Sequence, residues 1–110
     1  MKNMMDMVSM VKKAQAVQTQ MAAVQNKMEN TEFTGLAADG AVQVTMTGKF
    51  VPTSIKLDKS VVNPDDVETL EDLLLVAMKN AKAKIDDASE KAFDSIKKSL
   101  NLPENFELPF

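Results

Sequence analysis

The sequence predicts an α+β protein with the element order helix, three-stranded antiparallel meander, long C-terminal helix. Three observations lead to this fold class. Apolar residues recur at helical spacing over the first thirty residues, alternate with polar residues in the middle, and return to helical spacing in the last third. Glycines and prolines separate these segments. Because the chain has 110 residues, we expect one two-layer domain over residues 1–110.

The first helix is expected over residues 4–30, which contain neither glycine nor proline. Its apolar residues are spaced alternately by three and four positions, as in the a and d positions of a coiled coil. They are Met7, Met10, Ala14, Val17, Met21, Val24 and Met28. We call this stripe the methionine seam. Its flanking positions lack opposite charges, and its four methionines favour a pliable contact.

Three strands are expected at residues 31–36, 41–48 and 52–58. In the second of them, valines and Met46 alternate with polar residues. Asp39-Gly40 and Gly48-Lys49 are turn signals, and Pro52 stands near the start of the third strand, where a missing N–H does least harm. Val51, Ile55 and Leu57 should share one apolar face with the second strand.

The last helix is expected over residues 64–100, followed by an extended tail at 101–110. Asn63 could cap this helix, Pro64 could take its first position, and the acids that follow would meet its positive end. A helix of this length measures roughly 54 Å. A compact domain of this size has a radius of gyration of only about 13 Å. The helix should therefore need a covering surface from outside its own chain.

The same comparison of lengths applies to the first helix. Its roughly 40 Å exceed the about 23 Å of a seven-residue strand, so half of the methionine seam should find no partner on the chain's own sheet. A second copy is the commonest partner. The sequence thus predicts a homodimer with these contact residues: Met7, Met10, Ala14, Val17, Met21, Leu70, Leu74, Ala81 and Ile85.

Charge is unevenly distributed along the chain, which has a net charge of −3. Residues 64–110 hold six lysines against eleven acids, a net charge of −5. All 13 basic residues are lysines, so any phosphate contact would use point charges rather than bidentate guanidinium groups. The candidate phosphate contacts are Lys12, Lys13, Lys27, Lys79, Lys82 and Lys84. The plainer interpretation of these lysines is a solvated helix face.

Several function classes find no support in the residues. The chain has no cysteine or histidine, which removes thiol chemistry, zinc fingers and imidazole bases. The acids near Asp65 fit helix-dipole pairing better than a metal site. No phosphate loop or activated serine is evident. We expect no enzyme activity, no metal, no cofactor and no small-molecule substrate. Without a signal peptide or a membrane-spanning run, a cytoplasmic protein is expected.

Four stretches, in chain order, resemble the YbaB/EbfC family of bacterial nucleoid-associated proteins. They are "MVKKAQAVQTQM", "GAVQVTMTGKF" with "SIKLDKSVV", "LEDLLLVAMKNAKAKI" and the ending "LPENFELPF". The resemblance implies an α-β-β-β-α chain, an intertwined tweezer-like homodimer, and double-stranded DNA bound in the nucleoid by basic residues on the helices.

This chain departs from the family pattern mainly by losing positive charge. Gln43, Thr53, Ser54 and Glu107 stand where the family commonly has basic residues. Two functions therefore stay open. The first is a homodimer that binds duplex DNA through phosphates with little sequence preference. The alternative is a scaffold dimer that holds another protein through its acidic last helix and its Phe106/Phe110 tail.

Overall fold

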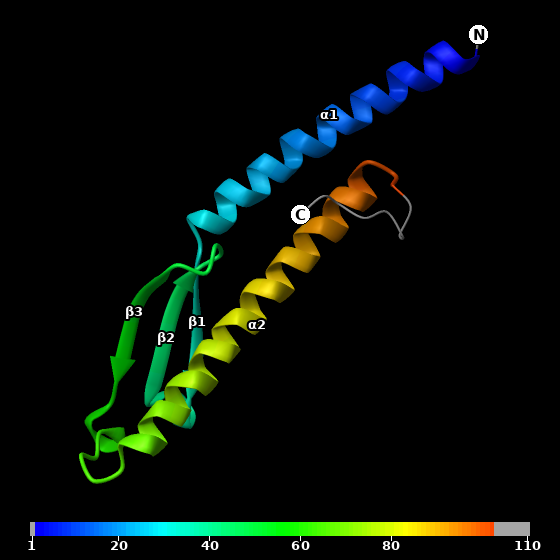
Figure 1. Cartoon of the computed structure of the whole chain (residues 1–110). Coiled ribbons are helices and arrows are strands. Elements are labelled where there is room, and N and C mark those ends of the chain that lie inside the picture. Colours follow the sequence, from blue (N-terminus) through cyan, green and yellow to red (C-terminus); the bar gives the residue numbers. More distant parts are fainter. Residues whose placement is uncertain (1, 103–110) are drawn as a thin grey trace. The chain divides into compact units, whose positions relative to one another are not determined.

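The computed structural model describes the backbone of residues 2–102 and the side chains of residues 7–102 (Figure 1). In chain order the elements are α1 (Lys2–Glu29), β1 (Glu32–Ala37), η1 (Ala38–Gly40), β2 (Val42–Thr47), β3 (Pro52–Leu57), η2 (Lys59–Val61) and α2 (Val67–Ser99). This order confirms the predicted fold class. The tail with Phe106 and Phe110 lies outside the described residues.

Contacts divide the chain into two compact units, and both long helices contribute to each of them. The sheet unit is Met28–Ser89, with the end of α1, the three strands and most of α2. The helical unit combines the chain up to Lys27 with the part from Glu90 onward. Each unit is described separately below.

The sheet unit is built on an antiparallel meander with the strand order β1-β2-β3. Gly35 pairs with Val44, and Val44 pairs with Ile55 on the other side. The pairing of β2 with β3 is irregular at Thr45/Met46, next to Pro52. Pro52 is the first residue of β3, as the sequence suggested, so its missing N–H falls at the irregular end of the ladder.

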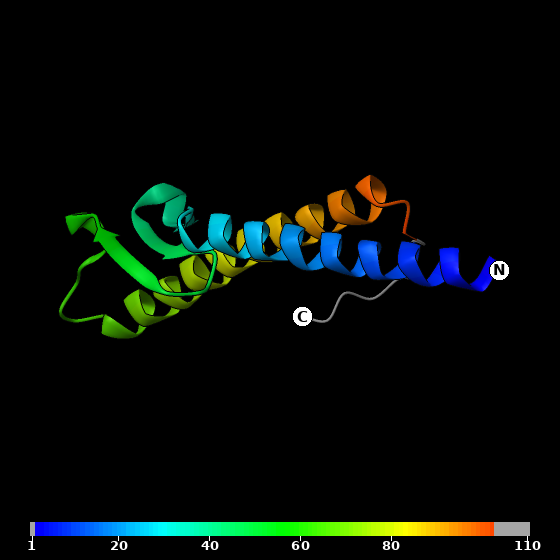
Figure 2. The ribbon, with the colours of Figure 1, turned by 90° about the horizontal axis from the view of Figure 1, so that it is seen from above.

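Helix α2 lies against one face of this sheet and forms the core with it (Figures 1 and 2). The buried members are Ala37, Val42, Val44 and Met46 from the sheet and Ala77, Ala81 and Ile85 from α2. Burying a side chain such as Ile85 contributes about 1.5–3 kcal/mol. Among the described residues, this buried cluster contains none from β3.

Gly35 explains why α2 packs so closely on β1. A Cβ atom at this position would lie 2.0 Å from the Ala77 carbonyl oxygen and 2.3 Å from the Ala81 backbone nitrogen. Real Cβ atoms essentially never come this near to another atom. The strand and the helix therefore touch backbone to backbone, and small residues line the contact on both sides.

Helix α2 begins three residues later than the sequence suggested. Asn63 and Pro64 belong to a turn in which Asn63 Oδ1 accepts from the Asp65 N–H at 3.0 Å. Asp66 caps the helix instead, since its Oδ1 accepts from the Thr69 N–H at 3.3 Å and its Oδ2 from the Thr69 hydroxyl at 2.7 Å. The prediction of Asn63 as the cap was wrong, because two Asx-type turns follow one another and only the second leads into the helix.

The other end of α2 closes with a left-handed residue. Asn101 has a φ of 53°, its N–H donates to the Lys98 carbonyl, and the Leu102 N–H donates to the Lys97 carbonyl at 2.8 Å. This pair of bonds is a Schellman motif, in which asparagine replaces the usual glycine. Residues 101 and 102 thus belong to the helix cap.

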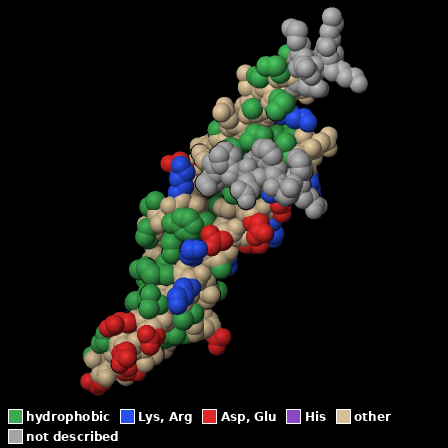
Figure 3. Space-filling view, turned by 45° about the vertical axis from the view of Figure 1, so that its right-hand side comes forward, with side chains coloured by type: hydrophobic (Ala, Val, Ile, Leu, Met, Phe, Trp, Pro, Cys, Tyr) green, Lys and Arg blue, Asp and Glu red, His purple; other side chains and the backbone are tan. Residues whose placement is uncertain are grey.

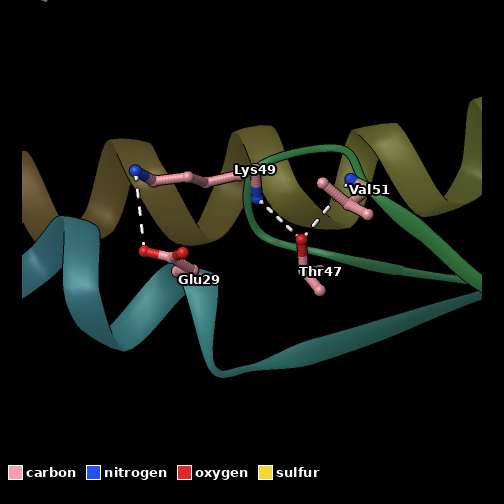
Figure 4. Close-up of polar contacts among 4 residues, drawn as sticks. All are labelled: Glu29, Thr47, Lys49 and Val51. Carbon is pink, nitrogen blue, oxygen red and sulfur yellow. Dashed lines mark hydrogen bonds and ion pairs between the residues drawn. The ribbon is translucent and has the colours of Figure 1, made fainter.

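The hairpin between β2 and β3 is tied to the end of α1. Its Gly48 N–H donates to the Met28 carbonyl at 2.8 Å, and Lys49 Nζ lies 3.7 Å from Glu29 Oε2 (Figure 4). Inside the turn, Thr47 Oγ1 accepts from the N–H groups of Lys49 and Val51 at 3.3 and 3.4 Å (Figure 4). This confirms Gly48-Lys49 as a turn.

Phe50 completes this turn in a left-handed conformation, with a φ of 62°. Such a φ is an outlier for a bulky residue and costs of order 1 kcal/mol. The Phe50 ring remains about half exposed, and Lys82 Nζ lies 5.9 Å from its centroid.

Among the described residues of the helical unit, the buried side chains are Val17 on α1 and Ile96 on α2. Gln20 Nε2 donates to Ser99 Oγ at 3.2 Å and joins the two helices of the unit. Toward the N-terminus the methionine seam is open, since Met7 and Met10 are 65% and 69% exposed. The seam thus contacts its own chain over only part of its length.

Candidate nucleic-acid interface

The lysines of α1 stand on a segment that carries no acid. From residue 7 to residue 28 the only charged residues are Lys12, Lys13 and Lys27, and all three side chains are exposed. In an α-helix each residue turns the direction by about 100°, so Lys27 points between the directions of Lys12 and Lys13, roughly 21 Å further along the axis. The three ammonium groups therefore share one face of α1.

The rest of this face is made of small and neutral side chains. Ser9, Ala16, Gln20 and Ala23 fall between the directions of Lys12 and Lys13. Hydroxyl and amide groups can donate to phosphate oxygens, and alanines let a ligand approach the helix closely. The arrangement suits a polyanion, because it offers positive charge over several turns of a segment whose own sequence contains no acid.

The three candidate lysines on α2 are all exposed but differ in their contacts. Lys84 Nζ donates to the Thr34 carbonyl of β1 at 2.6 Å, so its ammonium group is held by the sheet. Lys82 Nζ lies 2.6 Å from Asp86 Oδ2. Lys79 has no hydrogen-bond or ion-pair partner among the described residues.

These contacts rank the lysines of α2 as phosphate ligands. The Lys82–Asp86 pair is exposed, and such pairs contribute at most about 1 kcal/mol, so a phosphate could replace the carboxylate. Moving Lys84 would leave a strand carbonyl without its donor. Lys79 is therefore the best placed of the three, and Lys84 the least.

The opposite sign of charge gathers where α2 begins. Residues 58–72 contain six acids and one lysine, and acidic side chains cluster at that end of the sheet unit in Figure 3. Hydrogen bonds from the Ser60 backbone N–H and then its hydroxyl hold the pKa of Asp58 below its ordinary value of 3.8. Asp58 is therefore ionised at neutral pH, and this end of the unit repels phosphate.

Neither a metal centre nor a membrane span is found in the described part of the chain. Among residues 7–102, no three acidic side chains converge closely enough to hold a metal ion. No described helix is long and apolar enough to cross a bilayer.

The candidate dimer residues fall into two groups. Met7, Met10 and Ala14 are exposed and could meet a partner, whereas Met21, Leu70 and Leu74 are half-buried. Val17, Ala81 and Ile85 are buried within the chain itself. Ala81 and Ile85 have no exposed surface at all, because they form the core under the sheet. A dimer surface must therefore be sought elsewhere than at these two residues.

Strand β3 exposes apolar side chains that the sequence placed on a buried face. Ile55 and Leu57 do share a face with Val44 and Val42, as the pairing shows. They are nonetheless 52% and 41% exposed. The alternation of residues identified the face but could not show that α2 would cover only β1 and β2.

Asn80 is a contact that sequence reasoning missed. Its Nδ2 donates to the Leu36 carbonyl at 2.7 Å, one helical turn before Lys84 and its bond to Thr34. The available signal was a polar residue four positions before a lysine, next to the small residues Ala77 and Ala81.

Comparisons with known proteins agree with the resemblance found in the sequence. The model of the YbaB/EbfC DNA-binding family matches residues 1–100. A "Nucleoid-associated protein" of Bartonella tribocorum is 42% identical over 107 residues, covering 97% of this chain and 100% of that protein. One of Brucella ovis is 37% identical over 107 residues, with coverages of 97% and 100%.

A solved structure shares the fold. The uncharacterized protein HP0035 from Helicobacter pylori superposes with a TM-score of 0.64, covering 76% of this chain and 88% of that one. With 18% identity, this likeness concerns the fold alone.

Proposed function

Because the chain belongs to the YbaB/EbfC DNA-binding family, we propose that it is a nucleoid-associated homodimer that binds duplex DNA mainly through phosphates. The observation that carries this proposal is the lysine face of α1. It consists of Lys12, Lys13 and Lys27, exposed on one side of a helical segment without acids. Lys79 would add a contact from α2. Lys82 would add another once a phosphate replaces its partner, Asp86. Lys84 would contribute least.

Little sequence preference follows from the type of these residues. Phosphate contacts position a protein on DNA but carry no base information. Since the chain has no arginine, it lacks the bidentate fork that most often reads guanine. Affinity should therefore be similar for unrelated duplexes and should fall steeply as salt rises.

The homodimer is supported by the apolar surface that the chain leaves open. Met7 and Met10 on α1, and Ile55 and Leu57 on β3, are large apolar side chains with substantial exposure. A second copy would cover such surfaces and double the number of lysine faces. Sedimentation at micromolar concentration should give about twice 12.1 kDa. A monomer at this concentration would contradict the dimer.

A salt titration tests the DNA proposal. Fluorescence anisotropy with mixed-sequence duplexes should show binding at about 50 mM salt and a large loss by about 200 mM. In a dimer, replacing Lys12, Lys13 and Lys27 by glutamine would remove up to about six phosphate contacts. Each contact contributes about 0.9 to the slope of log affinity against log salt, so the slope should become shallower by as much as about 5. No binding at about 50 mM, or an unchanged slope, would refute the proposal.

A matched control removes lysines elsewhere on the surface. Lys49→Gln with Lys59→Gln takes two charges from the sheet unit outside the proposed contacts. It should change the slope far less than Lys12→Gln with Lys13→Gln does. Equal effects of the two pairs would mean that net charge, rather than the lysine face, controls binding.

The acidic end of the sheet unit supports the second candidate function, a dimer that holds another protein. Six acids in residues 58–72 could attract a basic partner. If this is the function, the DNA titration should show no signal at about 50 mM salt, while sedimentation still shows a dimer.

A further inference from the structure

The two outer edges of the sheet are finished differently. Strand order makes β1 and β3 the edge strands. Backbone groups of successive residues in an antiparallel strand point alternately to the two sides. The Gly48 N–H donates to the Thr31 carbonyl, so the backbone groups of Thr31 face β2. Thr34 and Leu36 lie three and five residues further along the chain, so their backbone N–H and C=O groups point away from β2. The outward carbonyls of both residues are occupied, Thr34 by Lys84 and Leu36 by Asn80.

The β3 edge lacks such a cover. The Asp58 N–H donates to the Ala41 carbonyl, so the backbone groups of Asp58 face β2. Ile55 and Leu57 lie an odd number of residues before Asp58, and by the same alternation their backbone groups point outward. Neither residue has a side-chain donor from α2 of the kind that covers β1, within the described chain. Their apolar side chains are also about half exposed. β3 therefore presents free hydrogen-bonding groups and apolar surface together, the combination that invites another strand.

We propose that a second copy pairs with this edge, β3 against β3 in antiparallel orientation, and joins two sheets into one of six strands. The inference rests on the homodimer proposed above and adds its contact surface. Charge supports the antiparallel direction. Acidic residues crowd the chain just after β3, from Asp58 to Asp72. A parallel pair would bring the two acidic ends together, whereas an antiparallel pair separates them.

Charge also excludes one register. Pairing centred on Lys56 would set two lysines directly opposite one another, which is unfavourable. Pairing centred on Ile55 places Ile55 opposite its own copy and Lys56 opposite Ser54 of the second copy. Ile55 then sits on the two-fold axis, and its apolar side chain meets an identical one. This register keeps Lys56 away from its counterpart and leaves most of β3 paired.

Because the chain contains no cysteine, a single introduced thiol tests this register directly. Because the backbone groups of Ile55 point outward, Ile55 and its copy would form a hydrogen-bonded pair of the new ladder. The Cα atoms of such a pair are about 5.5 Å apart, which is within the range for a disulfide. Under mild oxidation Ile55→Cys should form a covalent dimer in high yield at submicromolar concentration. Leu36→Cys, at the covered β1 edge, is the matched control and should remain mostly uncrosslinked.

A second variant tests the contact without covalent chemistry. Ile55→Glu would put two carboxylates on the two-fold axis and should sediment near 12.1 kDa with an unchanged circular dichroism spectrum, whereas Leu36→Glu stays dimeric. A dimeric wild type with no Ile55→Cys product, or equal yields for the two cysteine variants, would overturn the β3 contact while leaving the proposed function intact. A monomeric wild type would instead overturn the homodimer itself.

Discussion

Gly35→Ala tests the close contact between β1 and α2. The added Cβ would lie 2.0 Å from the Ala77 carbonyl oxygen, whereas ordinary contact begins at 3.4 Å. The obstacle is backbone on both sides, so no side-chain rotation can relieve it. Strand and helix must move apart by about 1.4 Å. A gap of about 1 Å already forfeits up to half of the dispersion energy of the atoms that line it.

The expected loss of stability follows from this displacement. Overpacking of a core costs about 1–3 kcal/mol, and Gly35 stands at the upper end because Ala77 and Ala81 are fully buried. Reduced freedom of the unfolded chain returns about 0.5–1 kcal/mol. We expect a net loss of about 2 kcal/mol in the free energy of unfolding. In a domain of this size the Tm would fall by roughly 10 °C.

Thermal and urea unfolding, followed by far-UV circular dichroism, measure this loss. Gly40→Ala is the matched control, since Gly40 has a φ of +92° and nothing lies within 4 Å of the added Cβ. It should cost only the backbone strain, about 1 kcal/mol. If Gly35→Ala proves as stable as the wild type, or no less stable than Gly40→Ala, the backbone contact is not as described.

Three further changes have distinct expected outcomes. Lys84→Met should lower the free energy of unfolding by about 1 kcal/mol, because the Thr34 carbonyl loses its donor. It should nevertheless weaken DNA binding less than Lys79→Met does. The reverse order of affinities in an anisotropy titration would contradict the ranking of these lysines. Asp66→Ala should cost about 1 kcal/mol in urea unfolding, and Asn63→Ala less, if Asp66 is the cap. Phe50→Asn should keep or raise stability by up to about 1 kcal/mol, since asparagine tolerates a positive φ; a lower urea midpoint would show that the ring contributes more than the strain costs.

Most of the fold could be predicted from the sequence because its periodicities are long and uninterrupted. Alternation over Val42, Val44 and Met46 predicted β2 with its buried face, and every strand lies within two residues of its expected bounds. The start of α2 was harder to predict. Asn63 and Asp66 are both good capping residues, and only the tertiary structure decides which of two consecutive turns begins the helix.

The candidate site could be predicted only as a set of residue types. The sequence identifies Lys79 and Lys84 equally well as basic residues on α2. Their different contacts depend on how closely α2 approaches β1, which depends in turn on Gly35. Likewise, the exposure of Ile55 is decided by the path of α2 across the sheet. Local sequence carries no signal for that path.

The side chains of Asn80 and Lys84 on the edge of β1 have a consequence for the size of any assembly. A sheet with two open edges can grow without limit, one copy after another, as fibrils do. Where one edge is occupied, each copy offers a single place for addition, and growth through strands stops at a pair. These two polar side chains would thus keep an assembly built through strand edges from growing beyond two copies.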